Sequence, residues 1–235
     1  MRRLRACIKA DLYLQVKYGF YTVYAIVTAV YILLLKQLPS ESLKIVTPMI
    51  VFSDPSMLGF FFIGGLVLLE KGENTLEYIT ATPLRIGEYL LSKMISLTLL
   101  ALMASFIVTL FSYGDLVHGI QLTIGIILTS SFFILVGFIA VARFQTVNRY
   151  ILSSIIYMTF LFLPLISYFG LWQNWIFYLF PTHASLILIG GAFQSTEWWK
   201  LGYGIGYLIL WIFIAYPLAH RAFYRFMILK EGERS

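Results

Sequence analysis

Long apolar runs separated by short polar segments constrain this chain more than any motif does. Six runs approach the roughly 20 residues with which an α-helix crosses about 30 Å of hydrocarbon. Backbone polar groups in lipid must be satisfied within the segment, so each run is predicted to be a transmembrane helix. The runs are Tyr18–Leu35, Val46–Leu69, Tyr89–Phe111, Ile120–Ala142, Tyr150–Phe169 and Tyr203–His220.

The overall composition excludes a soluble globule. Of the 235 residues, 60% are hydrophobic and only 12% are charged, and the mean hydropathy is +0.85. Such a chain has too little polar surface to coat a water-soluble fold. No internal repeat or charged linker divides it. The sequence therefore predicts an all-α polytopic membrane protein with a single domain over residues 1–235.

The distribution of basic residues predicts the orientation. If both termini lie on one side, 14 of the 17 Lys and Arg residues fall on that side, and only Lys36, Lys44 and Lys200 on the other. The positive-inside rule makes that side the cytoplasm. The basic residues are scattered singly, without the stripe that tracks a phosphate backbone, so no nucleic-acid partner is expected.

Residues 1–17 are predicted to form an amphipathic helix on the cytoplasmic leaflet, in contact with membrane lipids. Asp11 and Gln15 interrupt its apolar arc, and a frayed basic tail is the alternative. The apolar face holds Leu4, Cys7, Ile8 and Leu12, and the opposite face holds Arg2, Arg5, Lys9 and Lys17.

The polar hairpin 70–88 separates the second and third runs and must lie outside the hydrocarbon, in the cytoplasm. Within it, Asn74–Thr80 is predicted to be a short helix, because Asn74 or Thr75 can cap it and Leu76 and Ile79 share a face. Thr82-Pro83 then ends this helix and begins the next one.

The segment 170–202, between the fifth and sixth runs, is too apolar and aromatic for a solvated loop. It predicts two short helices that dip into the outer leaflet and break near Pro181. A count of seven or eight spans is the alternative.

Asp54 is interpreted as the one charge within a span, beside Pro55, Ser53 and Ser56. A carboxylate at mid-depth costs roughly 3 kcal/mol on insertion scales, so such groups usually face a cavity or a partner. One hypothesis makes Asp54, Ser53 and Ser56 part of a translocation path. The other is structural: Pro55 bends the helix, and Asp54 bonds the freed backbone groups or snorkels outward.

Catalytic and nucleotide-binding motifs are missing from the sequence. It has no G-x-x-x-x-G-K-[ST] phosphate loop, no H-E-x-x-H or G-x-S-x-G, and no paired Cys or His at zinc spacing. His118, His183 and His220 stand alone. We predict no catalytic site, metal site or cofactor in this chain.

One resemblance covers nearly the whole chain. The string from Glu70 through Leu76-Glu77 and Thr82-Pro83 to Lys93 resembles the segment after the second span of ABC-2 type transporter permeases. Within that family the chain looks most similar to permeases named as fluoroquinolone export subunits. That similarity lies in R-R-L-R-A near the start, F-S-D-P at 52–55, L-L-E-K at 68–71 and Asn148-Arg149.

The resemblance implies an exporter subunit in a bacterial or archaeal cell membrane, moving a drug-like, lipid-like or peptide-like amphipathic solute outward. Two cytoplasmic ATP-binding subunits would bind ATP and Mg, and a second permease, identical or not, would complete the pore. Asn74–Thr80 would be the coupling helix and Arg143–Arg149 a secondary contact. The residues implied in ATPase coupling are Glu70, Glu73, Asn74, Thr75, Leu76, Glu77, Ile79, Thr82, Pro83 and Arg85.

Two other function classes would require different features of the sequence. An enzyme embedded in the membrane and acting on lipid or peptide would need at least two polar catalytic groups at matched depth. A non-transporting membrane anchor or immunity protein would not need a rigid cytoplasmic hairpin. Co-purification with a soluble ATPase discriminates the exporter from both.

Overall fold

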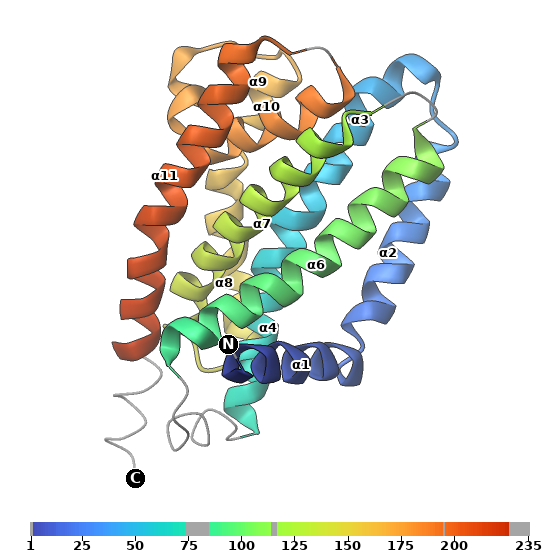
Figure 1. The fold of residues 1–235 in the computed structure, drawn as a ribbon. Helices are drawn as coiled ribbons and strands as arrows, with labels where there is room; N and C mark the ends of the chain where they lie inside the picture. The colour runs from blue at the N-terminus through green and yellow to red at the C-terminus, as the bar shows by residue number, and fades with distance from the viewer. Residues whose placement is uncertain (1, 74–84, 114–116, 195, 226–235) are drawn as a thin grey trace.

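Helices are the only regular elements in the part of the chain described by the computed structural model, residues 2–73, 85–113, 117–194 and 196–225 (Figure 1). In chain order they are α1 (Arg2–Lys17), α2 (Phe20–Leu35), α3 (Ser40–Ser53), the π-helical segment η1 (Asp54–Leu58), α4 (Gly59–Gly72), α6 (Ile86–Ser112), α7 (Gly119–Val141), α8 (Val147–Leu161), α9 (Leu165–Tyr168), the 3₁₀ helix η2 (Trp175–Leu179), α10 (Pro181–Phe193) and α11 (Trp198–Phe223).

Four of these elements are long and apolar enough to span a membrane: the continuous Ser40–Gly72 element, α6, α7 and α11. The pair α1 and α2, bent by 64°, makes a fifth if it counts as one span. The chain is therefore a multi-pass membrane protein. Because α2 and α8 have only 16 and 15 residues, the layout with six crossings stays a prediction.

The long helices form a bundle with two different ends. In Figure 1, α2, the α3–α4 element, α6, α7, α8 and α11 run along a common axis, and α1 lies across one end. At the other end, α9, η2 and α10 form a cap. Helix α7 is central and packs against α4, α6, α10 and α11.

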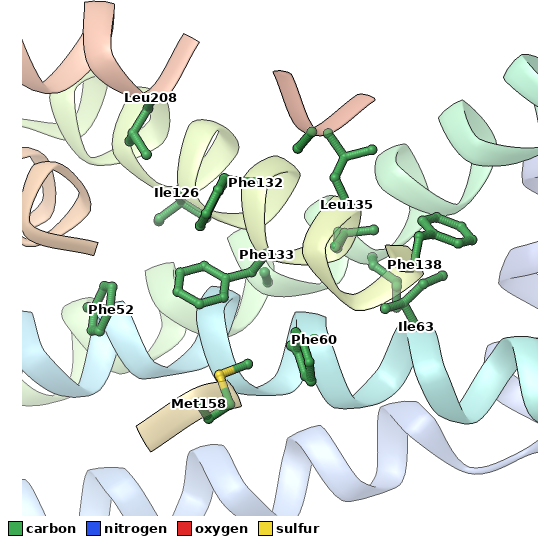
Figure 2. Packing of buried hydrophobic residues seen from close by; sticks show 14 of the residues in the cluster. Phe52, Phe60, Ile63, Ile126, Phe132, Phe133, Leu135, Phe138, Met158 and Leu208 are labelled. Atoms are coloured by element: carbon green, nitrogen blue, oxygen red, sulfur yellow. The ribbon is translucent and has the colours of Figure 1, made fainter. Parts of the chain in front are cut away.

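Aromatic and aliphatic side chains of α7 and the α3–α4 element fill the core (Figure 2). Phe133 and Phe138 of α7 and Phe60 of α4 belong to this core, to which α11 contributes Leu208 and α8 contributes Met158. These side chains are buried inside the bundle, so they hold the helices together by close packing.

Gly64 allows α8 to approach α4 closely. A Cβ atom at this position would overlap the ring of Tyr150. That ring stacks on Phe60, with centroids 5.7 Å apart, and its hydroxyl donates a 2.7 Å hydrogen bond to the Phe60 carbonyl. The contact therefore combines packing with a buried hydrogen bond.

Side-chain hydrogen bonds to backbone carbonyls tie the cap of α9, η2 and α10 to α8, α11 and the start of α3. Such bonds satisfy carbonyls that would be costly to leave unpaired in an apolar setting. The pairs are Thr182 to Leu161 at 2.6 Å, Tyr207 to Leu179 at 2.6 Å, Tyr168 to Ile45 at 2.9 Å and Gln194 to Lys44 at 3.0 Å.

A buried group of charges holds α1, α4 and α6 together at the opposite end. Lys93 of α6 has no exposed surface. Its ammonium contacts Asp11 Oδ1 of α1 at 2.6 Å and pairs with Glu70 Oε1 of α4. Tyr89 donates a hydrogen bond of 2.5 Å to the other oxygen of Glu70. We call Asp11, Glu70, Tyr89 and Lys93 the lysine network.

Helix α1 docks on α6 through the residues that interrupt its apolar arc. Besides Asp11, Gln15 donates a 2.8 Å hydrogen bond to Ser96 Oγ, and Ser92 donates to the Cys7 thiol at 3.1 Å. The alternative of a frayed tail is wrong, because α1 is helical from Arg2 to Lys17. Its polar stripe is a contact surface for the bundle.

We predict that Gly64→Ala destabilises the fold by about 1–3 kcal/mol, the usual cost of overpacking a core. The added methyl group must displace the Tyr150 ring. Gly65→Ala is the matched control, because a Cβ there would lie 3.7 Å from Phe20, an ordinary contact. Thermal unfolding in detergent measures both, and equal midpoints would contradict the assignment.

We predict that Lys93→Met costs about 3–5 kcal/mol, because it leaves two buried carboxylates without a cation. Lys17→Met is the control: its ion pair with Glu73 joins side chains that are 49% and 45% exposed, and such pairs contribute about 0–1 kcal/mol.

Cys7 is the chain's one cysteine, so its rate of maleimide labelling reports α1 docking. The rate should rise in Lys93→Met and not in Lys17→Met. Unchanged labelling in Lys93→Met would refute the docking role.

Candidate functional site

The hairpin 70–88 joins α4 to α6 at the end of the bundle where α1 lies. Its central residues, Asn74, Thr75, Leu76, Glu77, Ile79, Thr82 and Pro83, fall outside the described residues. The last turn of α4 and the first turn of α6 are described. The coupling helix therefore stays a prediction, and the geometry concerns the two stems that carry it.

Two of the glutamates assigned to coupling lie in different environments. Glu70 is 3% exposed and belongs to the lysine network. The Glu73 side chain is 45% exposed, and its carboxylate lies 3.5 Å from the ammonium of Lys17. Glu73 can meet a partner at the surface, whereas the position of Glu70 favours a role in fixing the base of the hairpin.

Basic residues surround the same end of the bundle. Arg85 is the N-cap residue of α6 and is exposed, and its backbone N–H donates a 3.0 Å hydrogen bond to the Glu88 carboxylate. Arg143 and Arg149 flank the connection from α7 to α8 and are also exposed. These exposed arginine side chains can contact either the anionic headgroups of a membrane leaflet or a soluble partner protein.

Asp54 begins the π-helical segment inside the second long element. It has no exposed surface, and neither carboxylate oxygen has a hydrogen-bond partner among the described residues. It lies close enough to Tyr24 and Tyr31 of α2 to interact with them electrostatically. A buried carboxyl group without a donor is costly, so its retention calls for an explanation.

The two serines beside Asp54 donate hydrogen bonds to backbone carbonyls near the helix break. Pro55 removes one N–H from the helical ladder. Ser53 donates to the Ile50 carbonyl at 2.7 Å, and Ser56 donates to the Phe52 carbonyl at 2.6 Å. The structural hypothesis assigned this task to Asp54. That assignment is wrong, because neither carboxylate oxygen of Asp54 has a hydrogen-bond partner among the described residues.

The histidines do not come together with these groups. His118 precedes α7, His183 lies in α10 and His220 lies in α11. Within the described ranges, no three His, Cys, Asp or Glu residues are grouped so that they could hold a metal ion.

Sequence reasoning missed the lysine network. Asp54 was interpreted as the one charge within a span, yet Lys93 lies inside the run Tyr89–Phe111 and is completely buried. The available signal was the spacing of four between Asp11 and Gln15, which places both on one face of α1. Two polar residues on one face of α1 indicate that this face contacts polar side chains of another helix.

Comparison with known proteins identifies the family. The model of the fluoroquinolones export permease protein family matches residues 2–231. Relatives from two Mycobacterium tuberculosis strains, CDC 1551 / Oshkosh and H37Rv, are both named fluoroquinolones export permease proteins. Each is 31% identical over 235 residues, which cover 99% of this chain and 99% of the relative. The chain therefore belongs to the fluoroquinolones export permease protein family and is a membrane export permease.

Proposed function

We propose that this chain is the transmembrane subunit of an ATP-driven ABC exporter that moves a drug-like, lipid-like or peptide-like amphipathic solute out of the cell. The observation that carries the proposal is the match to export permeases over practically the whole chain. The sequence has no phosphate loop, so the proposal requires a separate ATPase. Two cytoplasmic subunits would bind ATP and Mg, and this chain itself would not be an enzyme.

In the proposed topology the chain crosses the cell membrane six times with both termini in the cytoplasm. The bias of Lys and Arg supports this orientation, and the six apolar runs in the sequence support the count. At 1.5 Å per residue, the 16 residues of α2 span about 24 Å. Local thinning of the bilayer accommodates a mismatch of a few ångströms.

The proposed route of force from the ATPase runs through the two stems of the hairpin. The ATPase would contact Asn74–Thr80, with Glu73 and Arg85 at its edges. The lysine network joins α4 and α6 just inside the membrane and links both to α1. A push on the hairpin would therefore move three helices together.

The proposed translocation path includes Asp54, Ser53 and Ser56. Asp54 carries no hydrogen bond within the described residues, so its carboxyl group is available to a solute or a proton when the bundle opens. The buried position implies that the path is closed in this conformation. A second permease copy, identical or a paralogue, would supply the other wall, because one six-helix bundle is too small to enclose a bulky solute.

Co-purification tests the exporter. We expect the permease to retain a soluble ATPase whose hydrolysis rises with added solute in proteoliposomes. Leu76→Asp with Ile79→Asp should abolish docking, because it places two charges on the apolar face of the coupling helix. Gln37→Asp with Ser40→Asp, which adds the same charges at the outer end of the bundle, should leave docking intact. Docking that survives the first pair of changes would reject the coupling site, and activity of the isolated chain on lipid or peptide would favour an enzyme.

We predict that Asp54→Asn lowers transport by about tenfold, equivalent to about 1.4 kcal/mol, while the protein stays folded. Asp54→Leu should raise the unfolding temperature, because it removes a buried polar group without a partner, and should also impair transport. Efflux from inverted vesicles and thermal unfolding measure the two effects separately. Normal efflux in both variants would leave Asp54 with no function in the path.

A further inference from the structure

A groove of about 840 Å³ opens between the first turn of α6 and the last turns of α11. Figure 1 shows these two helix ends side by side, at the end of the bundle where α1 lies. The helices meet closely at Gly87, where a Cβ atom would lie 2.9 Å from the hydroxyl of Tyr216. Because residue 87 is a glycine, no side chain at this position fills the groove beside Tyr216.

The rim of the groove is positively charged. Arg85 and Arg221 line it and are both exposed, and His220 lies beside them. Among the described residues, neither guanidinium group forms an ion pair. Such planar groups bind phosphate oxygens through paired hydrogen bonds.

Among the described residues, Glu88 is the one acidic side chain that lines the groove. Its carboxylate accepts a hydrogen bond from the Arg85 backbone N–H and so occupies the N-terminus of α6. An anion in the groove must therefore be held by the arginine side chains, and it is opposed by Glu88.

Apolar surface continues from the charged rim toward the membrane interior. Leu91 lines the groove and is 39% exposed. Ile95 and Leu99 follow at intervals of four residues on the same face of α6, and both are exposed. The surface thus offers a basic rim for a headgroup and an apolar ridge for an acyl chain.

We propose that this groove binds an anionic glycerophospholipid of the cytoplasmic leaflet. The phosphate lies between Arg85 and Arg221, and an acyl chain follows Leu91, Ile95 and Leu99. Basic pockets between helices at the cytoplasmic surface are general sites for such headgroups. The exposed apolar side chains favour a lipid over free phosphate, because free phosphate has no acyl chain to contact them. The proposal rests on the membrane location of the chain and on the proposed orientation, and it is independent of ATPase coupling.

Native mass spectrometry of the purified full-length permease tests the site, with dioleoyl phosphatidylglycerol as the probe and dioleoyl phosphatidylcholine as the neutral comparison. Each arginine near an anionic lipid contributes about fivefold in affinity, so Arg85→Gln with Arg221→Gln should weaken phosphatidylglycerol binding by about 25-fold. Arg143→Gln with Arg149→Gln removes the same charge at the same end outside the groove and should change binding by less than about threefold.

A variant with the opposite effect excludes misfolding as the cause. Glu88→Gln keeps a side-chain acceptor for the Arg85 N–H but removes the opposing charge, so it should strengthen phosphatidylglycerol binding by about fivefold. Equal losses in the two arginine pairs, or no gain in Glu88→Gln, would overturn the site. Displacement of the lipid by millimolar inorganic phosphate would overturn the assignment to a lipid. Because the readout is lipid retention by the permease alone, neither result bears on ATPase docking.

Discussion

The pairing of one buried ammonium with two carboxylates governs the end of the bundle where α1 lies. Lys93 is fully buried and has a carboxylate partner on each of two other helices, Asp11 on α1 and Glu70 on α4. Removing a charge from water is costly, and these partners offset that cost only while all three helices stay in place. The geometry of α1, α4 and α6 is therefore set jointly, and the base of the proposed coupling hairpin is rigid.

Asp54, inside the continuous Ser40–Gly72 element, has a buried carboxyl group without such a partner in the described part of the chain. Its carboxyl oxygens have no hydrogen-bond partners within the described residues, while Ser53 and Ser56 donate to the backbone carbonyls of Ile50 and Phe52. One end of the bundle thus holds a buried ammonium group paired with two carboxylates, whereas the middle holds a carboxyl group with no hydrogen-bond partner among the described residues. A π-helical segment and an unpaired buried group are both features that occur preferentially at functional sites.

The apolar runs of the sequence predicted where the helices lie. The observed helix ends differ from the ends of those runs because of local backbone effects at glycine and proline residues. Gly19 adopts φ 74° between α1 and α2, a left-handed conformation that glycine tolerates, so α2 begins only at Phe20. Pro164 lies where the fifth run turns, so α8 ends at Leu161 and α9 follows separately. Pro39 caps α3, which begins at Ser40, before the apolar run itself. These boundaries depend on single residues that an averaged hydropathy pattern does not resolve.

By itself, the sequence determined that the chain is helical, lies in a membrane and resembles an export permease, because length, hydropathy and a few short strings carry that information locally. Only the tertiary structure decided which polar residues meet. Asp11, Glu70 and Lys93 are separated by 59 and 23 positions in sequence, and their contact arises from how three helices pack. Asp11 interrupts the apolar arc of α1, and the sequence alone does not show which residue it pairs with. The packing of α6 against α1 identifies that partner, because a buried charge is stable only beside its counter-charge.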